Sequence, residues 1–200
     1  LGEGSIYHPG GIDFDGESIW VPVAEYRPNS QAIMYRVSPK TLKSEEVFRF
    51  DDHIGALAYN RRHNTLHGAS WGGRKFYTWK PVSQETWSDL KTLPQSTMHM
   101  NGSHYIDYQD CAFLEENYML CSGLNSYEMP NIGRIALGGI ELVDLELQIA
   151  VHQIPIPLYS HKNRPMTQNP FAVELHDDHL RFYFLPDDHE SILYSYDAFT

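Results

Sequence analysis

An all-β fold made of repeated four-stranded sheets is predicted by three observations. Short runs rich in β-branched and aromatic residues recur along the 200-residue chain, in which 13% of the residues are aromatic. The first two runs are joined by Asp15-Gly16, a dipeptide that favours a tight turn between paired strands. The pattern then returns about every 45 to 60 residues, with four strands in a unit. This periodicity is typical of a β-propeller and favours it over a β-sandwich of many short strands.

The repeat divides the chain into four blades of one domain, at approximately 8–50, 51–103, 104–160 and 161–200. Strands are predicted at 11–14, 18–24, 31–37 and 46–50 in the first unit, and at 54–59, 66–71, 75–79 and 88–93 in the second. The third unit has strands at 111–114, 118–123, 139–144 and 150–154, with an insertion after its second strand. The fourth unit has three strands, at 171–175, 180–185 and 192–196. Small residues recur in the innermost strands, where blades crowd the axis: Gly11, Gly55, Ala56, Ala112 and Ala172.

How the ring closes is left open by the sequence. The segment 1–6 is a candidate edge strand, although Gly2 and Gly4 weaken it. If it completes the fourth unit, the protein is a closed four-bladed ring. If it is the last strand of an upstream blade, the four blades are part of a five-bladed ring. We expect an open or incomplete ring here, because the fourth unit lacks an outer strand.

Charge and hydropathy limit the partners that the protein can have. The net charge is −11, from 26 acidic and 15 basic residues, so we expect no nucleic-acid partner. Solubility is a sufficient explanation for an acidic surface. The longest apolar runs have the length of strands and are interrupted by Gly, Pro or charged residues, so we expect no membrane span.

Two cysteines, Cys111 and Cys121, flank a predicted turn around 115–117. A hairpin there places them opposite each other on paired strands, within about 6 Å between their Cα atoms. Cross-strand disulfides are uncommon, so two buried thiols are the favoured interpretation and a disulfide is the alternative.

Candidate site residues follow from the geometry of a propeller. Loops that enter the innermost strands and loops that join second to third strands emerge on the same face, around the mouth of the axial channel. A small-molecule ligand is therefore expected at that mouth. The ligand-binding candidates on these loops are Glu25, Arg27, Trp71, Arg74, Tyr108, Gln109 and Asn169.

A divalent metal is a second possibility at the same mouth. His8, His53 and Asp110 occupy equivalent strand entries, and imidazole with carboxylate suits Zn²⁺ or Mn²⁺. An oxygen set from Glu25, Asp110 and Asn169 suits Ca²⁺ better. The alternative is that both histidines cap strand ends by bonding to backbone carbonyls, since no dense ligand motif such as HExxH is present.

Arginine and tryptophan side chains at the channel mouth are candidates for binding an anion and for stacking on a ring. Arg27 and Arg74 occupy corresponding loops, and paired guanidinium groups there suit a carboxylate or phosphate. Their alternative role is a salt bridge to Glu25 or Asp52. Trp71 is a candidate stacking wall for a sugar or an aromatic ligand, with packing between blades as its alternative. Trp20 and Trp79 lie within predicted strands, and we expect them in the core.

Three motifs in the chain resemble a known family. They are HPGGIDFDGESIWVPVAEYRPNS at 8–30, LHGASWGGRKFYTW at 66–79 and QNPFAVEL at 168–175. They are similar to an uncharacterised family of bacterial and fungal β-propeller proteins, and the similarity spans essentially the whole chain. The resemblance implies one further blade before Leu1, hence five blades, and an exported protein that is secreted or periplasmic. A looser likeness to gluconolactonase-type propellers concerns the fold.

Two hypotheses of function follow. The first is a metal-assisted hydrolase of lactone or ester type, in which a metal at the channel mouth polarises a carbonyl. The alternative is a non-catalytic propeller that binds a small anionic or sugar ligand or a protein partner. The chain contains no P-loop, GxGxxG or CxxC motif, so a nucleotide-binding protein and a redox dithiol are not indicated.

Overall fold

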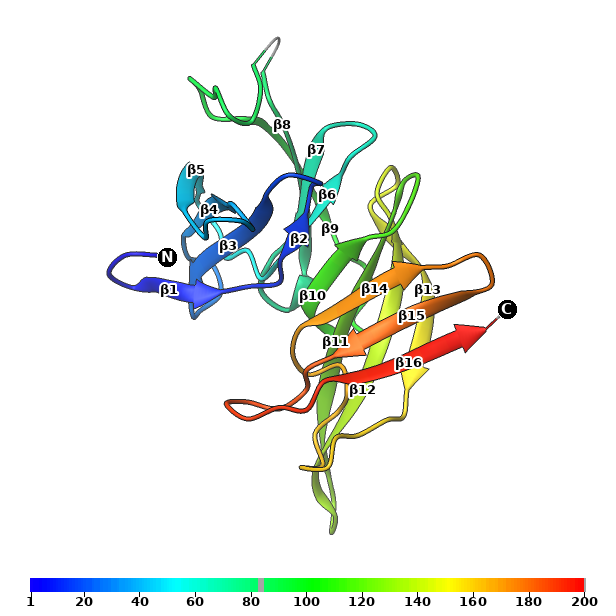
Figure 1. The fold of residues 1–200 in the computed structure, drawn as a ribbon. Coiled ribbons are helices and arrows are strands. Elements are labelled where there is room, and N and C mark those ends of the chain that lie inside the picture. The colour runs from blue at the N-terminus through cyan, green and yellow to red at the C-terminus, as the bar shows by residue number, and fades with distance from the viewer. Residues whose placement is uncertain (83–84, 200) are drawn as a thin grey trace.

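Four antiparallel sheets follow one another along the chain and form the blades of a β-propeller (Figure 1). The computed structural model describes residues 1–82 and 85–199. Within these ranges the helical content is a single 3₁₀ turn, η1 (Trp71–Gly73). The predicted all-β propeller class is therefore confirmed.

The strands of the four blades are arranged in chain order. The first blade contains β1 (Ile6–Pro9), β2 (Asp13–Phe14), β3 (Ile19–Glu25), β4 (Ala32–Val37) and β5 (Ser44–Phe50). The second contains β6 (Ala56–Asn60), β7 (Thr65–Ala69), β8 (Lys75–Lys80) and β9 (Gln95–Met100). The third contains β10 (Asp107–Phe113), β11 (Tyr118–Met129), β12 (Gly133–Asp144) and β13 (Ile149–Ile156). The fourth contains β14 (Phe171–Leu175), β15 (His179–Phe184) and β16 (Tyr194–Phe199).

The innermost strand of the first blade is interrupted where it meets the second blade. β1 and β2 both pair with β3, and Gly10 and Gly11 lie between them. Gly11 donates its N–H to the carbonyl of Gly55 at 2.8 Å, and the N–H of Leu57 returns a bond to the Gly11 carbonyl at 3.1 Å. A side chain on Gly10 would place its Cβ 2.4 Å from the Gly55 carbonyl oxygen. The two glycines therefore permit direct backbone contact between blades.

Each pair of neighbouring blades encloses its own hydrophobic core. Trp20 and Met34 of the first blade pack with Leu57 and Trp79 of the second. Separate clusters join the second blade to the third and the third to the fourth. Trp20 and Trp79 are 0% and 1% exposed, so their predicted core positions are confirmed.

The fourth strand of the second blade lies later in the chain than predicted. The sequence pattern favoured 88–93, whereas the strand is β9 at Gln95–Met100. Every residue of β9 is exposed, and the strand begins with three polar residues, so it lacks the pattern of a half-buried strand. Trp87, which precedes β9 in the chain, is buried against Trp20 and Phe48.

The predicted insertion in the third blade is a continuous extension of a hairpin. β11 and β12 stay in register from the Tyr118–Asp144 pair to the Met129–Gly133 pair. Figure 1 shows this hairpin projecting beyond the rest of the blade. The outer part of the hairpin is largely exposed, so it lacks the apolar run that marked the inner half as a strand.

The arc of blades is open between the first and the fourth, as predicted. The start of the chain does not pair with β16: β1 joins the first blade, and Glu3 forms only an isolated bridge with Ile6. An apolar groove of about 770 Å³ lies at the opening, lined from both sides by residues that include Ile19 and Tyr183. A closed four-bladed ring is therefore not formed by this chain, and the five-bladed ring stays a prediction.

Cys111 and Cys121 form a disulfide, so the preference for two free thiols was wrong. The residues are direct partners on β10 and β11, with their Cα atoms 4.1 Å apart, which agrees with the predicted proximity. Both are almost completely buried in the core between the second and third blades. The predicted register already placed the two cysteines close enough to bond. The preference for thiols rested on the general rarity of cross-strand disulfides, which does not describe this particular pair.

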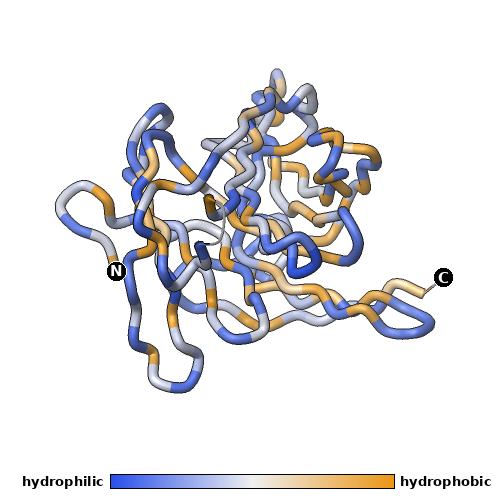
Figure 2. The backbone as a smooth tube through the Cα atoms, turned by 90° about the horizontal axis from the view of Figure 1, so that it is seen from above, coloured by the Kyte–Doolittle hydropathy of each residue, from blue (hydrophilic) through white to orange (hydrophobic). Residues whose placement is uncertain are grey.

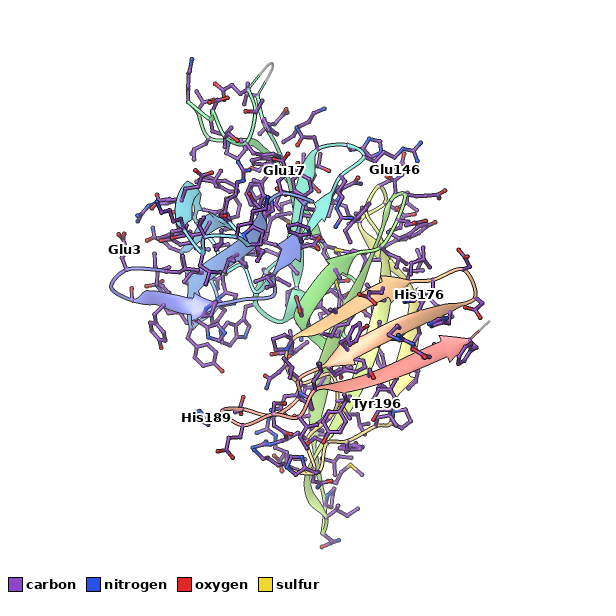
Figure 3. All side chains as sticks on the ribbon, viewed as in Figure 1. Glu3, Glu17, Glu146, His176, His189 and Tyr196 are labelled. Carbon is purple, nitrogen blue, oxygen red and sulfur yellow. A yellow bond between two sulfur atoms is a disulfide. The ribbon has the colours of Figure 1, made fainter. Side chains whose placement is uncertain are left out.

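Charged residues lie mainly at the periphery. Figure 2 shows hydrophilic residues gathered at the turns and hydrophobic stretches along the strands. Glu3, Glu17 and Glu146, which are labelled in Figure 3, are examples of exposed acidic side chains. Within residues 1–82 and 85–199, no helix has the length and hydropathy needed to span a bilayer.

Candidate functional site

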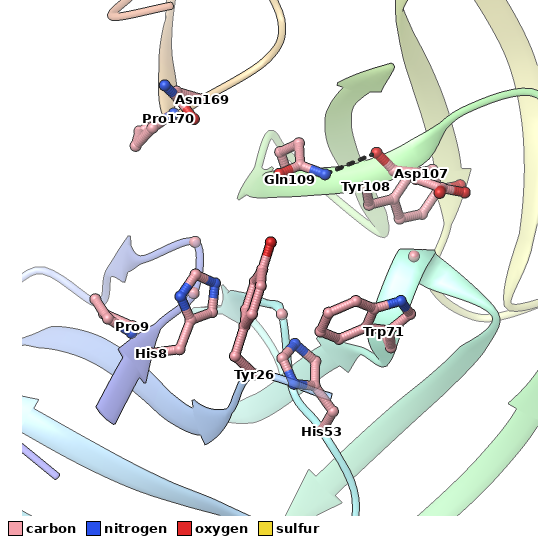
Figure 4. Close-up of a pocket in the computed structure, with 14 residues that line it drawn as sticks. His8, Pro9, Tyr26, His53, Trp71, Asp107, Tyr108, Gln109, Asn169 and Pro170 are labelled. Atoms are coloured by element: carbon pink, nitrogen blue, oxygen red, sulfur yellow. Dashed lines mark hydrogen bonds between the residues drawn. The ribbon is translucent and has the colours of Figure 1, made fainter. Parts of the chain in front are cut away.

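A cavity of about 230 Å³ opens where the innermost strands begin. All four blades contribute to its lining (Figure 4). The side chains that face it come from β1, the loop after β3, the loop before β6, η1, β10 and the loop before β14: His8, Tyr26, His53, Trp71, Asp107, Tyr108, Gln109 and Asn169. Six of the predicted site residues are among these eight.

Four rings form one wall of the cavity. The His8 ring lies 4.6 Å from the Tyr26 ring and 6.3 Å from the His53 ring, measured between centroids. Trp71 completes the group, 5.2 Å from Tyr26 and 4.9 Å from His53, and its ring plane is steeply inclined to both, at 62° and 72°. We call these four residues the aromatic wall. Because Tyr26 is 61% exposed, the wall presents ring surface to the cavity rather than burying it in a core.

The tautomer of His53 is fixed by a backbone contact. Its Nδ1 lies 2.8 Å from the carbonyl oxygen of Glu25, which can only accept, so Nδ1 carries the proton. Nε2 is therefore the unprotonated nitrogen, and it faces Gly55, where an added Cβ would lie 3.3 Å away. This contact agrees with the alternative prediction that the histidine caps a strand end, yet it leaves one nitrogen free to accept a bond.

The surroundings of both histidines in the aromatic wall favour their neutral form. Burial lowers the pKa of His53 below its ordinary value, and the neighbouring His8 ring acts in the same direction. The bond to Glu25 and the charge of Asp52 oppose that change. Burial also lowers the pKa of His8. Both shifts disfavour a positive charge on the wall near neutrality.

The opposite side of the cavity carries side-chain amides. Asn169 donates its amide N–H groups to the Pro186 carbonyl at 3.0 Å and to Asp188 at 3.1 Å, which leaves its carbonyl oxygen as an acceptor. Gln109 is exposed and makes one long bond, 3.5 Å, to the carbonyl of Asp107. Its position faces the aromatic wall across the cavity (Figure 4).

Tyr108 is held in the cavity floor by a buried network. Its hydroxyl donates to the carboxylate of Glu141, a side chain that is 0% exposed. Glu141 also accepts from Ser103 Oγ at 2.5 Å and Gln153 Nε2 at 2.8 Å. Burial raises the pKa of Tyr108 well above its ordinary value, and the Glu141 charge adds to the effect. Tyr108 therefore offers the cavity its ring and not a reactive phenolate.

The predicted arginine pair does not line the cavity. Arg27 pairs with Glu25 at 2.5 Å, and Glu25 also accepts from Ser5 at 2.6 Å. Arg74 pairs with Asp107 and donates to the Gly72 carbonyl at 2.6 Å. Both guanidinium groups are thus used in salt bridges. The Arg27–Glu25 pair is one of the predicted alternatives, whereas Arg74 pairs with Asp107 and the predicted Asp52 pairs with Lys75. An anion at the channel mouth would have to break these pairs.

Asp110 lies apart from the two histidines. It is 1% exposed, and its oxygens accept the backbone N–H groups of Cys111 at 2.9 Å and Phe171 at 3.1 Å. Within the described ranges, no three His, Cys, Asp or Glu side chains lie together as a metal-binding group. The structure therefore brings together His8 and His53 but neither predicted ligand set in full, and metal binding stays a prediction that rests on the two imidazoles.

Tyr26 is the main site residue that the sequence candidates omitted. Glu25 and Arg27 were selected from the same loop because they are charged. The segment 25–27 forms a tight turn, in which the Arg27 N–H donates to the Glu25 carbonyl at 2.8 Å. The side chains of Glu25 and Arg27 pair with each other, and Tyr26 between them lines the cavity. Its position in a loop that joins a second to a third strand was the signal that could have found it.

Blades around a cavity lined by rings and amides define a β-propeller with a candidate ligand site at the mouth of its channel. The chain belongs to DUF6454, a family of unknown function, whose model matches residues 1–200. The expectation of an uncharacterised family is thereby confirmed at this level. No curated protein matches the chain.

The chain resembles solved structures at low sequence identity. One is an engineered GH43 glycoside hydrolase that displays both endo-xylanase and exo-arabinofuranosidase activity, with a TM-score of 0.61 and 7% identity over 96% of this chain and 39% of that chain. Another is the WD40 β-propeller domain of Doa1, with a TM-score of 0.44 and 8% identity over 92% of this chain and 64% of that one. The chain thus spans 39% of the length of the hydrolase, and at 7% identity that likeness concerns the fold alone.

Proposed function

We propose that the axial cavity binds a sugar ring without cleaving it. The observation that carries the proposal is the aromatic wall opposite two side-chain amides. A sugar ring has an apolar C–H face that packs on an aromatic ring and hydroxyl groups around its edge that need hydrogen-bond partners. The wall supplies the first surface, and the carbonyl oxygens of Gln109 and Asn169 supply acceptors on the other side.

The charge and size of the cavity support a neutral ligand ring. Its one lining carboxylate, Asp107, is paired with Arg74, and the surroundings of both lining histidines favour their neutral form. A neutral ring can therefore enter the cavity without burying an unpaired charge, so the cost of desolvating a charged group does not oppose its binding. The cavity of about 230 Å³ equals the volume of about eight liquid water molecules, which suits one monosaccharide ring.

Replacing Trp71 with alanine is expected to weaken saccharide binding by roughly tenfold to a hundredfold, because a large ring surface is lost from the wall. The measurement is isothermal titration of the purified protein with a panel of neutral mono- and disaccharides. Tyr7→Ala is the matched control, since Tyr7 is an exposed ring on β1 that does not line the cavity. A panel in which no saccharide binds the wild-type protein, or an unchanged affinity in Trp71→Ala, would contradict the proposal.

A second candidate is metal-assisted hydrolysis of a lactone or ester, the first of the two hypotheses from the sequence. The observation that favours it is the pair of imidazoles whose surroundings favour the neutral form, with Nε2 of His53 unprotonated, because this is the form that ligates metals. When bound, a divalent metal supplies Lewis acidity toward a carbonyl. His8 and His53 would hold it from two neighbouring blades.

The two candidates are separated by metal analysis of the purified protein and by a lactone and ester panel with and without chelator. If the protein is a hydrolase, a chelator should abolish turnover. The variants His8→Ala and His53→Ala should then lose both the bound metal and the turnover. Sugar binding predicts affinities that chelator does not change. If the purified protein contains no metal and shows no turnover, the hydrolase hypothesis is excluded.

A further inference from the structure

A second cavity, of about 610 Å³, lies beside the long β11–β12 hairpin. It is lined on one side by β11 and β12, through residues that include Ser126 and Arg134, and on the other by the segment before β14, through residues that include Tyr159, Arg164 and Gln168. We call it the hairpin cavity. Gln168 lines it while the next residue, Asn169, lines the axial cavity. The loop before β14 therefore borders both cavities.

The hairpin cavity holds two arginines whose charges are not used elsewhere. Of the nine arginines in the sequence, six donate to a carboxylate, hydroxyl or carbonyl: Arg27, Arg36, Arg49, Arg61, Arg74 and Arg181. In the part of the chain that the structure describes, Arg62, Arg134 and Arg164 make no side-chain hydrogen bond or ion pair. Two of these three line the hairpin cavity.

The lining of the hairpin cavity contains no carboxylate among the described residues, although the chain carries a net charge of −11. The nearest acid along the hairpin is Glu128, which lies opposite Arg134 in the β11–β12 register without forming an ion pair with it. Neutral hydrogen-bonding groups complete the lining, from Ser126, Asn163 and Gln168. Such a set is arranged for an anionic group and not for a cation.

The loop that carries Arg164 is held in place before any ligand arrives. The Ser160 N–H donates to the Arg164 carbonyl at 2.8 Å, which closes a tight turn. Ser160 Oγ donates to Asp187 at 2.7 Å and accepts the Arg164 N–H at 3.3 Å, and Asn163 takes a positive φ of 60° within the turn. Because the backbone is fixed, binding an anion orders only the arginine side chain.

We propose that the hairpin cavity binds the anionic group of an acidic saccharide whose neutral ring occupies the axial cavity. The proposal rests on the proposed function, since it extends the same ligand across Gln168 and Asn169 from one cavity to the next. The anionic group is a uronate carboxylate or a sulfate ester, both of which two guanidinium groups bind through paired N–H donors. The ligand class is therefore an acidic oligosaccharide.

The test is titration calorimetry with three oligosaccharides of equal length: a neutral one, an oligouronate and a sulfated one. At low salt we expect at least one acidic oligosaccharide to bind about tenfold or more tightly than the neutral one. The Arg134→Ala/Arg164→Ala double variant should bind all three with the affinity of the neutral ligand. The two acidic arms distinguish carboxylate from sulfate.

Three further variants sharpen the result. Arg62→Ala removes an equally unpaired arginine outside the cavity and should change no affinity. Glu128→Gln removes a carboxylate from the rim and should strengthen acidic ligands a few-fold without affecting the neutral one. Trp71→Ala should weaken neutral and acidic ligands alike, because one molecule occupies both cavities.

Each contrary outcome overturns a distinct statement. If neutral and acidic oligosaccharides bind equally, the anion site fails while sugar binding in the axial cavity stands. If acidic ligands bind tightly but Trp71→Ala does not lower their affinity, the proposal that one ligand occupies both cavities is wrong. If the arginine double variant also loses the neutral ligand, the arginines do not act through an anion. If no saccharide binds, both proposals fail.

Discussion

Replacing Asp110 with alanine is expected to lower the free energy of unfolding by about 3–5 kcal/mol. The carboxylate accepts backbone N–H groups from Cys111 in its own blade and Phe171 in the fourth blade, and it is also bonded to the backbone of Ile12 in the first. The alanine variant leaves these buried donors without an acceptor, at a cost of about 1–3 kcal/mol each. One side chain thus links three blades at the axis.

The side chain of Asp110 is packed tightly against the first blade. Its Oδ1 would lie 2.0 Å from a Cβ on Gly11, so the carboxylate fills the space that the glycine leaves. Burial raises the pKa of Asp110 well above its ordinary value, while the bonds to Phe171, Cys111 and Ile12 oppose that change. Asp110→Asn, which keeps one acceptor oxygen at nearly the same size, should cost less than alanine.

Urea denaturation of the wild-type protein, Asp110→Ala, Asp110→Asn and Asp177→Ala measures these differences. Asp177 is an exposed acid in the β14–β15 turn, and its removal should change stability by less than about 0.5 kcal/mol. An Asp110→Ala variant within about 1 kcal/mol of the wild type would show that the axial hydrogen bonds contribute little.

The stability of the protein is expected to fall by about 3 kcal/mol between pH 7 and pH 4 because of His67 alone. Burial lowers the pKa of His67 to about 4, and the nearby His63 acts in the same direction. The ring is 6% exposed, with Nδ1 3.0 Å from Thr78 Oγ1 and Nε2 2.9 Å from Thr65 Oγ1. It is therefore held neutral between two hydroxyl groups.

The sign follows from proton binding in the two states. The unfolded chain takes up a proton at the ordinary histidine pKa near 6.5, whereas the folded protein resists it until about pH 4. Between these values the unfolded state binds more protons, so the free energy of unfolding rises with pH. The stabilisation is complete above pH 6.5 and is lost as the pH falls through that window.

Urea denaturation at pH 4, 5, 6 and 7 tests this dependence. His67→Gln, which keeps polar atoms near both threonines, should show a pH dependence smaller by about 3 kcal/mol over the range. His99→Gln, at an exposed position on β9, is the control for the loss of a histidine as such. If His67→Gln and the wild type have the same slope, His67 is not the group that titrates.

The sequence repeat was sufficient to predict which residues gather at the cavity, because equivalent positions of successive blades lie around one axis in a propeller. His8, His53, Gln109 and Asn169 lie at equivalent points of successive repeats, so assigning the repeat placed them at one mouth. Trp71 followed from the loop between a second and a third strand. None of these assignments required knowing the direction of an individual side chain.

The residues that were misplaced depend on side-chain direction. The β10–β11 register shifts between Tyr108 and Asp110, so a bulge turns Gln109 toward the cavity and Asp110 into the axis. No pattern in the sequence marks that bulge. The Arg74–Asp107 pair joins residues 33 positions apart, and a long flexible side chain takes whichever carboxylate the fold brings near.

The Cys111–Cys121 bond also bears on the order in which the chain folds. It spans ten residues within one hairpin, and a loop of this length closes far faster than distant blades can meet. Oxidation can therefore fix the register of β10 and β11 before the neighbouring blades arrive. β10 contacts both β6 and β14, so an early, covalently aligned hairpin provides the template on which the second and fourth blades assemble.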